Sequence, residues 1–185
     1  MKIRYLAILL CAMAHNLLGQ SVSFNKANSF YIEFLGHSAT SFSVNYERVF
    51  YENNKSYISG WLGLGSYNLP LQFIDDREGF NIPFGLNSTW GKNNHHMEFG
   101  IGSGINHGRS IEKPNPLFFR MLFSMRVGYR FQKPSGGFLF RAGITPTFPA
   151  YYFYDNRDGL LEDLDLIFHL VGISVGYTFK NSEKR

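Results

Sequence analysis

The chain is poor in cysteine, and its amino-terminal apolar segment is too short for a membrane-spanning helix. The one cysteine, Cys11, follows Leu10, where a lipoprotein signal has a small residue, so we expect no lipid anchor. The apolar run from Tyr5 to Ala14 falls short of the roughly 20 residues that a helix needs to cross a bilayer. Without this segment no thiol remains, which excludes disulfide bonds and a cysteine nucleophile.

Residues 1–20 have the layout of a secretory signal peptide. Lys2 and Arg4 form a short basic region, the apolar run follows, and a cleavage region precedes Ser21. A membrane anchor or a buried strand is the alternative interpretation of the same segment. We expect a signal peptide over residues 1–20 and one domain over residues 21–185, because the remaining length suits a single domain.

Charge is also sparse. The formal net charge is +4, and removal of the predicted signal peptide leaves +2. The basic residues are scattered, with no run beyond Lys184 and Arg185, whereas nucleic-acid-binding proteins gather them on one face. The sequence also lacks a phosphate-binding loop, a dinucleotide fingerprint and a zinc-ribbon spacing. We therefore expect no nucleic-acid partner and no cofactor.

What the chain does contain is aromatic residues and glycine, with 19 Phe, 11 Tyr and 19 Gly among its 185 residues. Apolar side chains recur at every second position in segments of about 8 to 13 residues, which is the period of a β-strand. Turn signals separate these segments. Eight strands are predicted, over 29–36, 41–50, 57–66, 80–90, 96–106, 119–131, 138–145 and 169–179.

The two faces of the predicted strands differ in kind. In the strand over 119–131 every odd position is apolar, whereas the even positions include three arginines. Glycine shares the charged face, which suits a crowded barrel interior and has no purpose on a water-facing surface. Buried charges need partners, so we expect these residues to neutralise one another, plugging and stiffening the interior. The predicted interior ion network comprises Glu33, Glu47, Glu98, Arg120, Arg126, Arg130 and Arg141.

Short and long connections alternate along the chain. Short turns are expected near 52–55, 91–95 and 132–137, and longer loops near 67–79, 107–116 and 146–168. This alternation is typical of outer-membrane barrels, whose tilted strands cross roughly 25–30 Å of hydrocarbon. The predicted fold is an all-β, eight-stranded antiparallel up-and-down transmembrane β-barrel. The alternative is a soluble β-sandwich, which would pack the apolar faces inside.

Three segments carry a resemblance: "FNIPFGLNSTWGKNNHHMEFGIGSGI", "RVGYRF…GGFLFRAGITPTF" and "VGISVGYTF". They resemble small, mostly uncharacterised single-domain bacterial outer-membrane β-barrel proteins, similar to the eight-stranded OmpA/OmpX type. The resemblance implies localisation in the bacterial outer membrane after signal-peptide export, with outer-membrane lipid as a partner. It also implies that the barrel-insertion machinery recognises an aromatic last strand, here through Tyr177 and Phe179. It brings no catalytic residues.

Histidine and acidic residues suggest two metal sites, and neither has the required spacing. His37, His107 and His169 fall at outer strand ends or in loops, where the three or four ligands of a zinc site do not converge. The acidic residues of two loops do not follow a calcium-binding pattern, so we interpret them as solvated charge and expect no metal. These residues are Asp75, Asp76, Glu78, Asp155, Asp158, Glu162, Asp163 and Asp165.

Three functions are compatible with such a barrel. The preferred one is a structural or surface-interaction role, with long outer loops that bind a surface ligand. The second is a lipid-modifying enzyme, which needs a Ser–His pair oriented by a third group. His107 with Ser110 and Glu112, or His37 with Ser38, would have to supply it, and we expect no catalytic site. The third is a narrow channel, against which the charged interior argues.

Overall fold

The computed structural model describes residues 27–37, 42–53, 56–66, 77–110, 117–154, 157–159 and 167–179. Side chains are described throughout these ranges except at 77–78, 109–110, 117–118, 120, 149–154, 157–159 and 167–170. The strands are β1 (Asn28–Phe34), β2 (Phe42–Glu52), β3 (Ser56–Ser66), β4 (Arg77–Lys92), β5 (His95–Ser110), β6 (Leu117–Gln132), β7 (Gly137–Tyr154), β8 (Arg157–Gly159) and β9 (Ile167–Phe179). The described part of the chain contains no helix long and apolar enough to cross a membrane.

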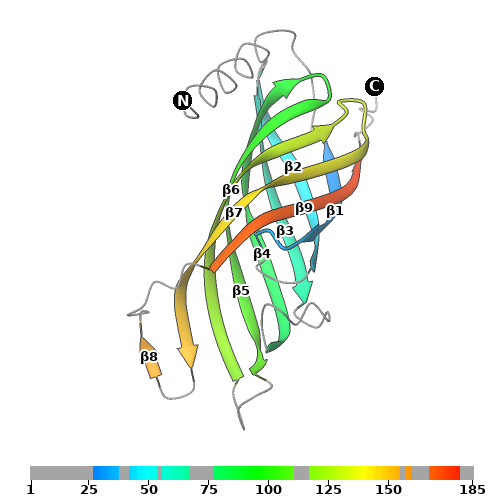
Figure 1. The fold of residues 1–185 in the computed structure, drawn as a ribbon. Coiled ribbons are helices and arrows are strands. Elements are labelled where there is room, and N and C mark those ends of the chain that lie inside the picture. The colour runs from blue at the N-terminus through cyan, green and yellow to red at the C-terminus, as the bar shows by residue number, and fades with distance from the viewer. Residues whose placement is uncertain are drawn as a thin grey trace, which may run out of the picture.

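The strands form one sheet that closes on itself (Figure 1). Each strand from β1 to β7 pairs with the next in antiparallel fashion, and β9 pairs with both β7 and β1. β8 pairs only with the end of β7 and stands outside the ring. The predicted all-β, eight-stranded, antiparallel up-and-down barrel is therefore confirmed as a fold.

The strands are strongly staggered around the ring. Ser29 of β1 pairs directly with Thr178 of β9, but a path across successive Cα partners in the other direction reaches β9 at Ile167. Such an offset arises when tilted strands close into a barrel, and eight strands leave an interior just wide enough for side chains to fill. The path runs through Glu47, Trp61, Gly85, Gly102, Ser124 and Thr147.

One side of the barrel is longer than the sequence predicts. β7 continues beyond Thr145 to Tyr154 because it stays paired with β6, so the predicted loop over 146–168 is wrong in its first half. The chain passes Pro149 at a bulge, where Ala150 has no opposing residue, and bulges are where strands tolerate proline. In Figure 1, β4 to β7 extend the barrel wall well beyond β1 to β3 at its lower end.

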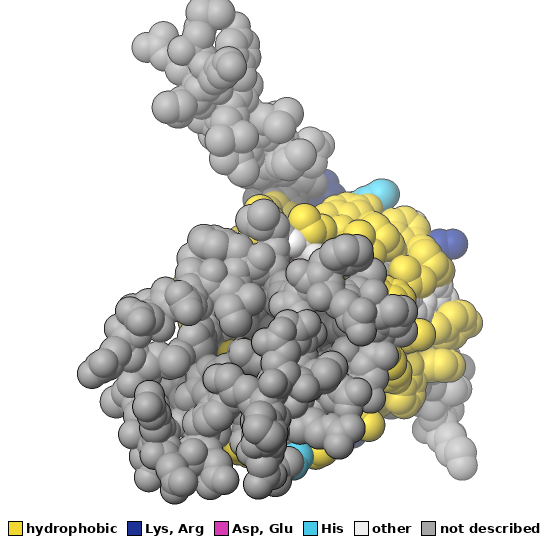
Figure 2. Space-filling view, turned by 60° about the horizontal axis from the view of Figure 1, so that its bottom comes forward, with side chains coloured by type: hydrophobic (Ala, Val, Ile, Leu, Met, Phe, Trp, Pro, Cys, Tyr) yellow, Lys and Arg dark blue, Asp and Glu magenta, His cyan; other side chains and the backbone are white. Residues whose placement is uncertain are grey.

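The side chains alternate as the sequence predicts. Phe123 and Val175 point outward with 38% and 42% of their surface exposed, whereas Arg126 and Arg141 are 1% and 0% exposed inside. The described side chains that cover the visible wall in Figure 2 are mostly hydrophobic. A sandwich with an apolar core is therefore the wrong alternative, since the interior of this sheet is polar.

Two facing glycines let β6 and β7 approach each other. Gly128 pairs with Gly143, and a Cβ on either would lie within 3 Å of the backbone of the other. Both lie on the inner face: Gly128 lies between Arg126 and Arg130 on β6, and Gly143 lies two residues after Arg141 on β7. The absence of side chains here leaves space for the guanidinium groups of these neighbours.

Candidate functional site: the charged barrel interior

Five strands bring charged side chains to the centre of the barrel. Glu33 comes from β1, Glu47 from β2 and Glu98 from β5, and all three are buried. Three buried arginines, two on β6 and one on β7, face them. Each lies at an inward position of its strand because side chains alternate along a strand. The described interior therefore balances three carboxylates with three guanidinium groups.

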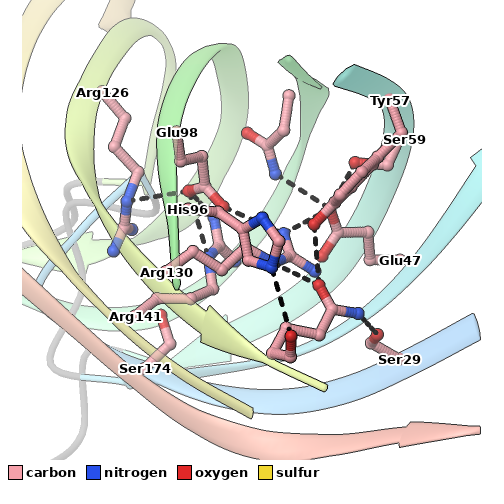
Figure 3. A network of polar contacts seen from close by, with 12 residues as sticks. Ser29, Glu47, Tyr57, Ser59, His96, Glu98, Arg126, Arg130, Arg141 and Ser174 are labelled. Carbon is pink, nitrogen blue, oxygen red and sulfur yellow. Dashed lines mark hydrogen bonds and ion pairs between the residues drawn. The ribbon is translucent and has the colours of Figure 1, made fainter. Parts of the chain in front are cut away.

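Glu98 is the centre of the network (Figure 3). Its Oε1 atom accepts hydrogen bonds from Arg141 Nη2 at 2.6 Å and Arg141 Nε at 3.1 Å, and lies 3.2 Å from Arg126 Nε. Its Oε2 atom accepts a hydrogen bond from Arg130 Nη1 at 2.9 Å. One carboxylate thus holds three arginines that the chain contributes from two different strands.

The other two carboxylates complete the pairing of these arginines. Glu33 forms an ion pair with Arg126 and accepts a hydrogen bond from Ser174 Oγ at 3.1 Å. Glu47 Oε1 accepts a hydrogen bond from Arg130 Nη1 at 2.9 Å, and Ser59 also donates to it. Each carboxylate therefore has a cationic partner, which offsets part of the desolvation cost of burying the charge.

Neutral polar residues extend the network toward the end of the barrel with short turns. Arg130 Nε and Tyr57 Oη both donate to Gln132 Oε1, at 2.6 and 2.7 Å, and Gln132 Nε2 donates to Thr178 Oγ1 at 2.9 Å. The whole network takes a side chain from every strand of the ring, so it cross-links the barrel. One member from each strand of the ring, in chain order, is Glu33, Glu47, Tyr57, Asn87, Glu98, Arg130, Arg141 and Thr178.

The connection after β1 folds inward. Gly36 takes a left-handed conformation, with φ of +84°, and the backbone N–H of His37 donates to Glu33 Oε2 at 3.2 Å. The His37 ring packs against Trp61, tilted by 36° with 4.8 Å between ring centroids, and its Nδ1 atom lies 2.8 Å from Ser124 Oγ. His37 lies in the turn after β1, as predicted, but its side chain is buried in the barrel, which the sequence did not indicate.

The structure brings together six of the seven predicted interior residues, and the side chain of Arg120 lies outside the described part. The network also contains neutral residues that were not predicted, among them Tyr57, Asn87 and Gln132. Alternation along the strands places Tyr57 and Asn87 on the inner face, whereas Gln132 falls in the predicted turn over 132–137. A neutral side chain on that face carries no charge that would mark it as part of an ion network.

The described interior contains one Ser–His pair. His37 and Ser124 are within hydrogen-bond distance, which nucleophilic catalysis requires. Both are buried, and Glu33 binds the backbone of His37 and not its ring, so among the described residues no acid is hydrogen-bonded to the imidazole. The described His107 ring packs against Phe80 on the outer wall. The side chains of Ser38, Ser110, Glu112 and His169 lie outside the described part.

Metal ligands do not gather in the described residues: no three His, Cys, Asp or Glu side chains are placed to hold an ion. The acidic side chains predicted to be solvated lie outside the described part. Tyr177 and Phe179, predicted as the insertion signal, point outward at the end of β9, with 4.9 Å between their ring centroids.

In comparisons with known proteins, no family model, curated protein or solved structure matches this chain. The closed eight-stranded barrel is consistent with the OmpA/OmpX type, and membership of a family stays a prediction.

Proposed function

We propose that this chain is an integral outer-membrane β-barrel protein. The supporting observation is that apolar and charged side chains are distributed in the opposite way to that in a soluble protein. Large apolar side chains cover the outside of the closed sheet, whereas the inside holds the buried charges. Soluble proteins rarely expose a continuous apolar surface of this size. A closed barrel also satisfies the backbone hydrogen bonds of every strand in the ring, which hydrocarbon requires of any spanning sheet.

The dimensions of the wall support the same proposal. From Phe119 to Phe131 on β6, every second residue is apolar and points outward. At about 3.3 Å per residue and a tilt near 40°, these strands cover roughly 30 Å, which matches a hydrocarbon core. Aromatic side chains, which favour membrane interfaces, occupy one end of this band at Trp90, Tyr129 and Tyr177.

The charged interior argues for a plugged barrel with a structural or surface-interaction role. The ion pairs and hydrogen bonds join all eight strands of the ring across the lumen, so opening a path for solutes would require breaking several buried pairs. Breaking one such pair costs about 3–5 kcal/mol. A narrow channel is therefore the weaker alternative. A lipid-modifying enzyme is also weaker, because the described Ser–His pair is buried.

The chain would reach the membrane by export and insertion. The predicted signal peptide over residues 1–20 would direct export, and Tyr177 and Phe179 would present the last strand to the barrel-insertion machinery. β9 pairs with both β1 and β7, so its insertion would complete the ring. Partners in this setting are outer-membrane lipid and a surface ligand bound by the longer loops.

Electrophoresis of the mature chain with and without boiling tests the membrane proposal. A membrane barrel folded into detergent micelles or vesicles resists the detergent of the gel and changes mobility on boiling. A stable monomer in detergent-free buffer would contradict the proposal. Liposome swelling then tests the plug: vesicles that contain the folded barrel should show no more sugar influx than empty vesicles, and rapid influx would favour the channel.

A further inference from the structure

We propose that the short-turn end of the barrel binds the anionic phosphate headgroups of one membrane leaflet. The site is a basic rim formed by Arg48, Lys92 and Lys133. This inference rests on the proposed membrane location and adds the lipid class and the end of the barrel that contacts it.

Arg48 is the cation that β2 contributes to the rim. It is exposed on the outer face, and its Cα partner on β1 is Asn28, the first residue of that strand. Asn28 in turn pairs with Phe179, the last residue of β9. Arg48 therefore lies near the end of the barrel where β1 begins and β9 ends, with the exposed Phe50 between it and the turn to β3.

Lys92 and Lys133 continue the rim around the barrel. Lys92 is the last residue of β4 and pairs with His95 at the two-residue turn to β5. Lys133 follows the last residue of β6 and is exposed. The three cations thus come from β2, β4 and the end of β6, which are alternate strands of the ring. Within the described part of the chain, none of them forms an ion pair.

Amphipathic aromatic residues mark the same end as a membrane interface. Tyr46 donates a hydrogen bond from its hydroxyl to Asn28 Oδ1 at 2.7 Å, close to Arg48. Among the outer-face residues whose side chains are described, the tyrosines and the tryptophan lie in this half of the barrel, together with Phe50, Phe138 and Phe179. The residues at the short-turn end are Tyr46, Tyr51, Trp90, Tyr129 and Tyr177. Such rings sit at headgroup depth, where lysine and arginine extend their stems along apolar surface and place their charge in the headgroup layer.

The charge at this end is complementary to phosphate. Of the four glutamates whose side chains are described, three are buried in the interior network, and Glu52 lies near the rim. The described outer surface therefore carries more positive than negative charge at the short-turn end. Each lysine or arginine close to an anionic bilayer favours binding by about fivefold, and salt screens the effect.

Trp90 provides a local reporter for the test. It points outward beside Lys92, while the second tryptophan, Trp61, is buried in the lumen, so Trp61→Phe leaves one fluorophore at the rim. The folded protein is reconstituted in phosphatidylcholine vesicles that contain brominated phosphatidylglycerol or brominated phosphatidylcholine as the quencher. We expect the anionic quencher to act at about fivefold lower mole fraction in low salt, and the difference to shrink in 1 M salt.

Variants assign the effect to the rim. Arg48→Gln, Lys92→Gln and Lys133→Gln together should bring the two quenchers to equal potency, whereas the matched control Glu52→Gln should keep or increase the preference. If the triple variant does not fold, the single variants should each lower the preference. Equal quenching by both lipids in the parent would overturn the inference and leave the membrane proposal intact. Absence of quenching by either lipid would overturn the membrane proposal as well.

Discussion

Replacement of Glu98 by glutamine should destabilise the barrel more than any other single charge removal in the interior. Glu98 pairs with three arginines, at distances from 2.6 to 3.2 Å, whereas Glu33 and Glu47 each form an ion pair with one. Glutamine keeps the shape of the side chain and removes the charge. The described interior then holds three guanidinium groups and two carboxylates, so one cation is buried without a counter-ion.

The expected loss is large on the scale of protein stability. Removing one partner of a buried ion pair costs about 3–5 kcal/mol, because the remaining charge has neither water nor a partner. Arg141 is the most affected arginine, since both of its hydrogen bonds in the described network go to Glu98. We therefore expect Glu98→Gln to lower the free energy of unfolding by about 3–5 kcal/mol.

Urea unfolding of the barrel in phospholipid vesicles, followed by tryptophan fluorescence, measures this difference. Glu52→Gln near the rim is the matched control and should change the unfolding free energy by less than about 0.5 kcal/mol. Glu98→Gln combined with Arg141→Gln restores the charge balance, so the double variant should lose less than the sum of the two single variants. A loss below about 1 kcal/mol for Glu98→Gln would refute the reasoning. Such a small loss would mean that the Glu98 carboxylate is not a buried partner of the three arginines.

Three further predictions address the wall and the inward turn. Met125→Arg, in the middle of the outer face of β6, should cost about 2–4 kcal/mol in the same vesicle assay, with Met125→Leu nearly neutral; a cost near zero would mean that water covers this position. Gly128→Ala should lower the folded fraction on an unboiled gel, because the added Cβ would meet the backbone of β7. Gly60→Ala on the outer face should leave the folded fraction unchanged, because the added Cβ would be 3.5 Å or more from its neighbours. Equal folded fractions would contradict the close approach of β6 and β7. His37→Ala should cost about 1–3 kcal/mol and shift the tryptophan emission, because it removes a ring packed in the lumen and leaves Ser124 without its partner; an unchanged spectrum and stability would place the ring elsewhere.

The alternation of side chains was readable from the sequence because it depends only on local geometry. Successive side chains of a strand point to opposite faces, so the pattern around Arg126 and Arg130 determines that both point away from Phe123 whatever strand lies beside them. The same rule predicted the outward position of Val175 and the inward position of Glu98. These assignments agree with the structure, and so does the number of strands in the ring.

The tertiary structure alone decided which charges meet and where the strands end. Glu98 binds Arg141 because the registers of β5 with β6 and of β6 with β7 align Glu98 with Gly128 and Gly143, next to Arg141, and no local pattern encodes those registers. β7 continues to Tyr154 because β6 lies alongside to pair with it, although Pro146 and Pro149 suggest a loop. The inward fold of His37 likewise depends on Trp61 and Ser124, which lie on distant strands. Periodicity is a property of neighbours in the chain, whereas register, closure and ion pairing are properties of neighbours in space.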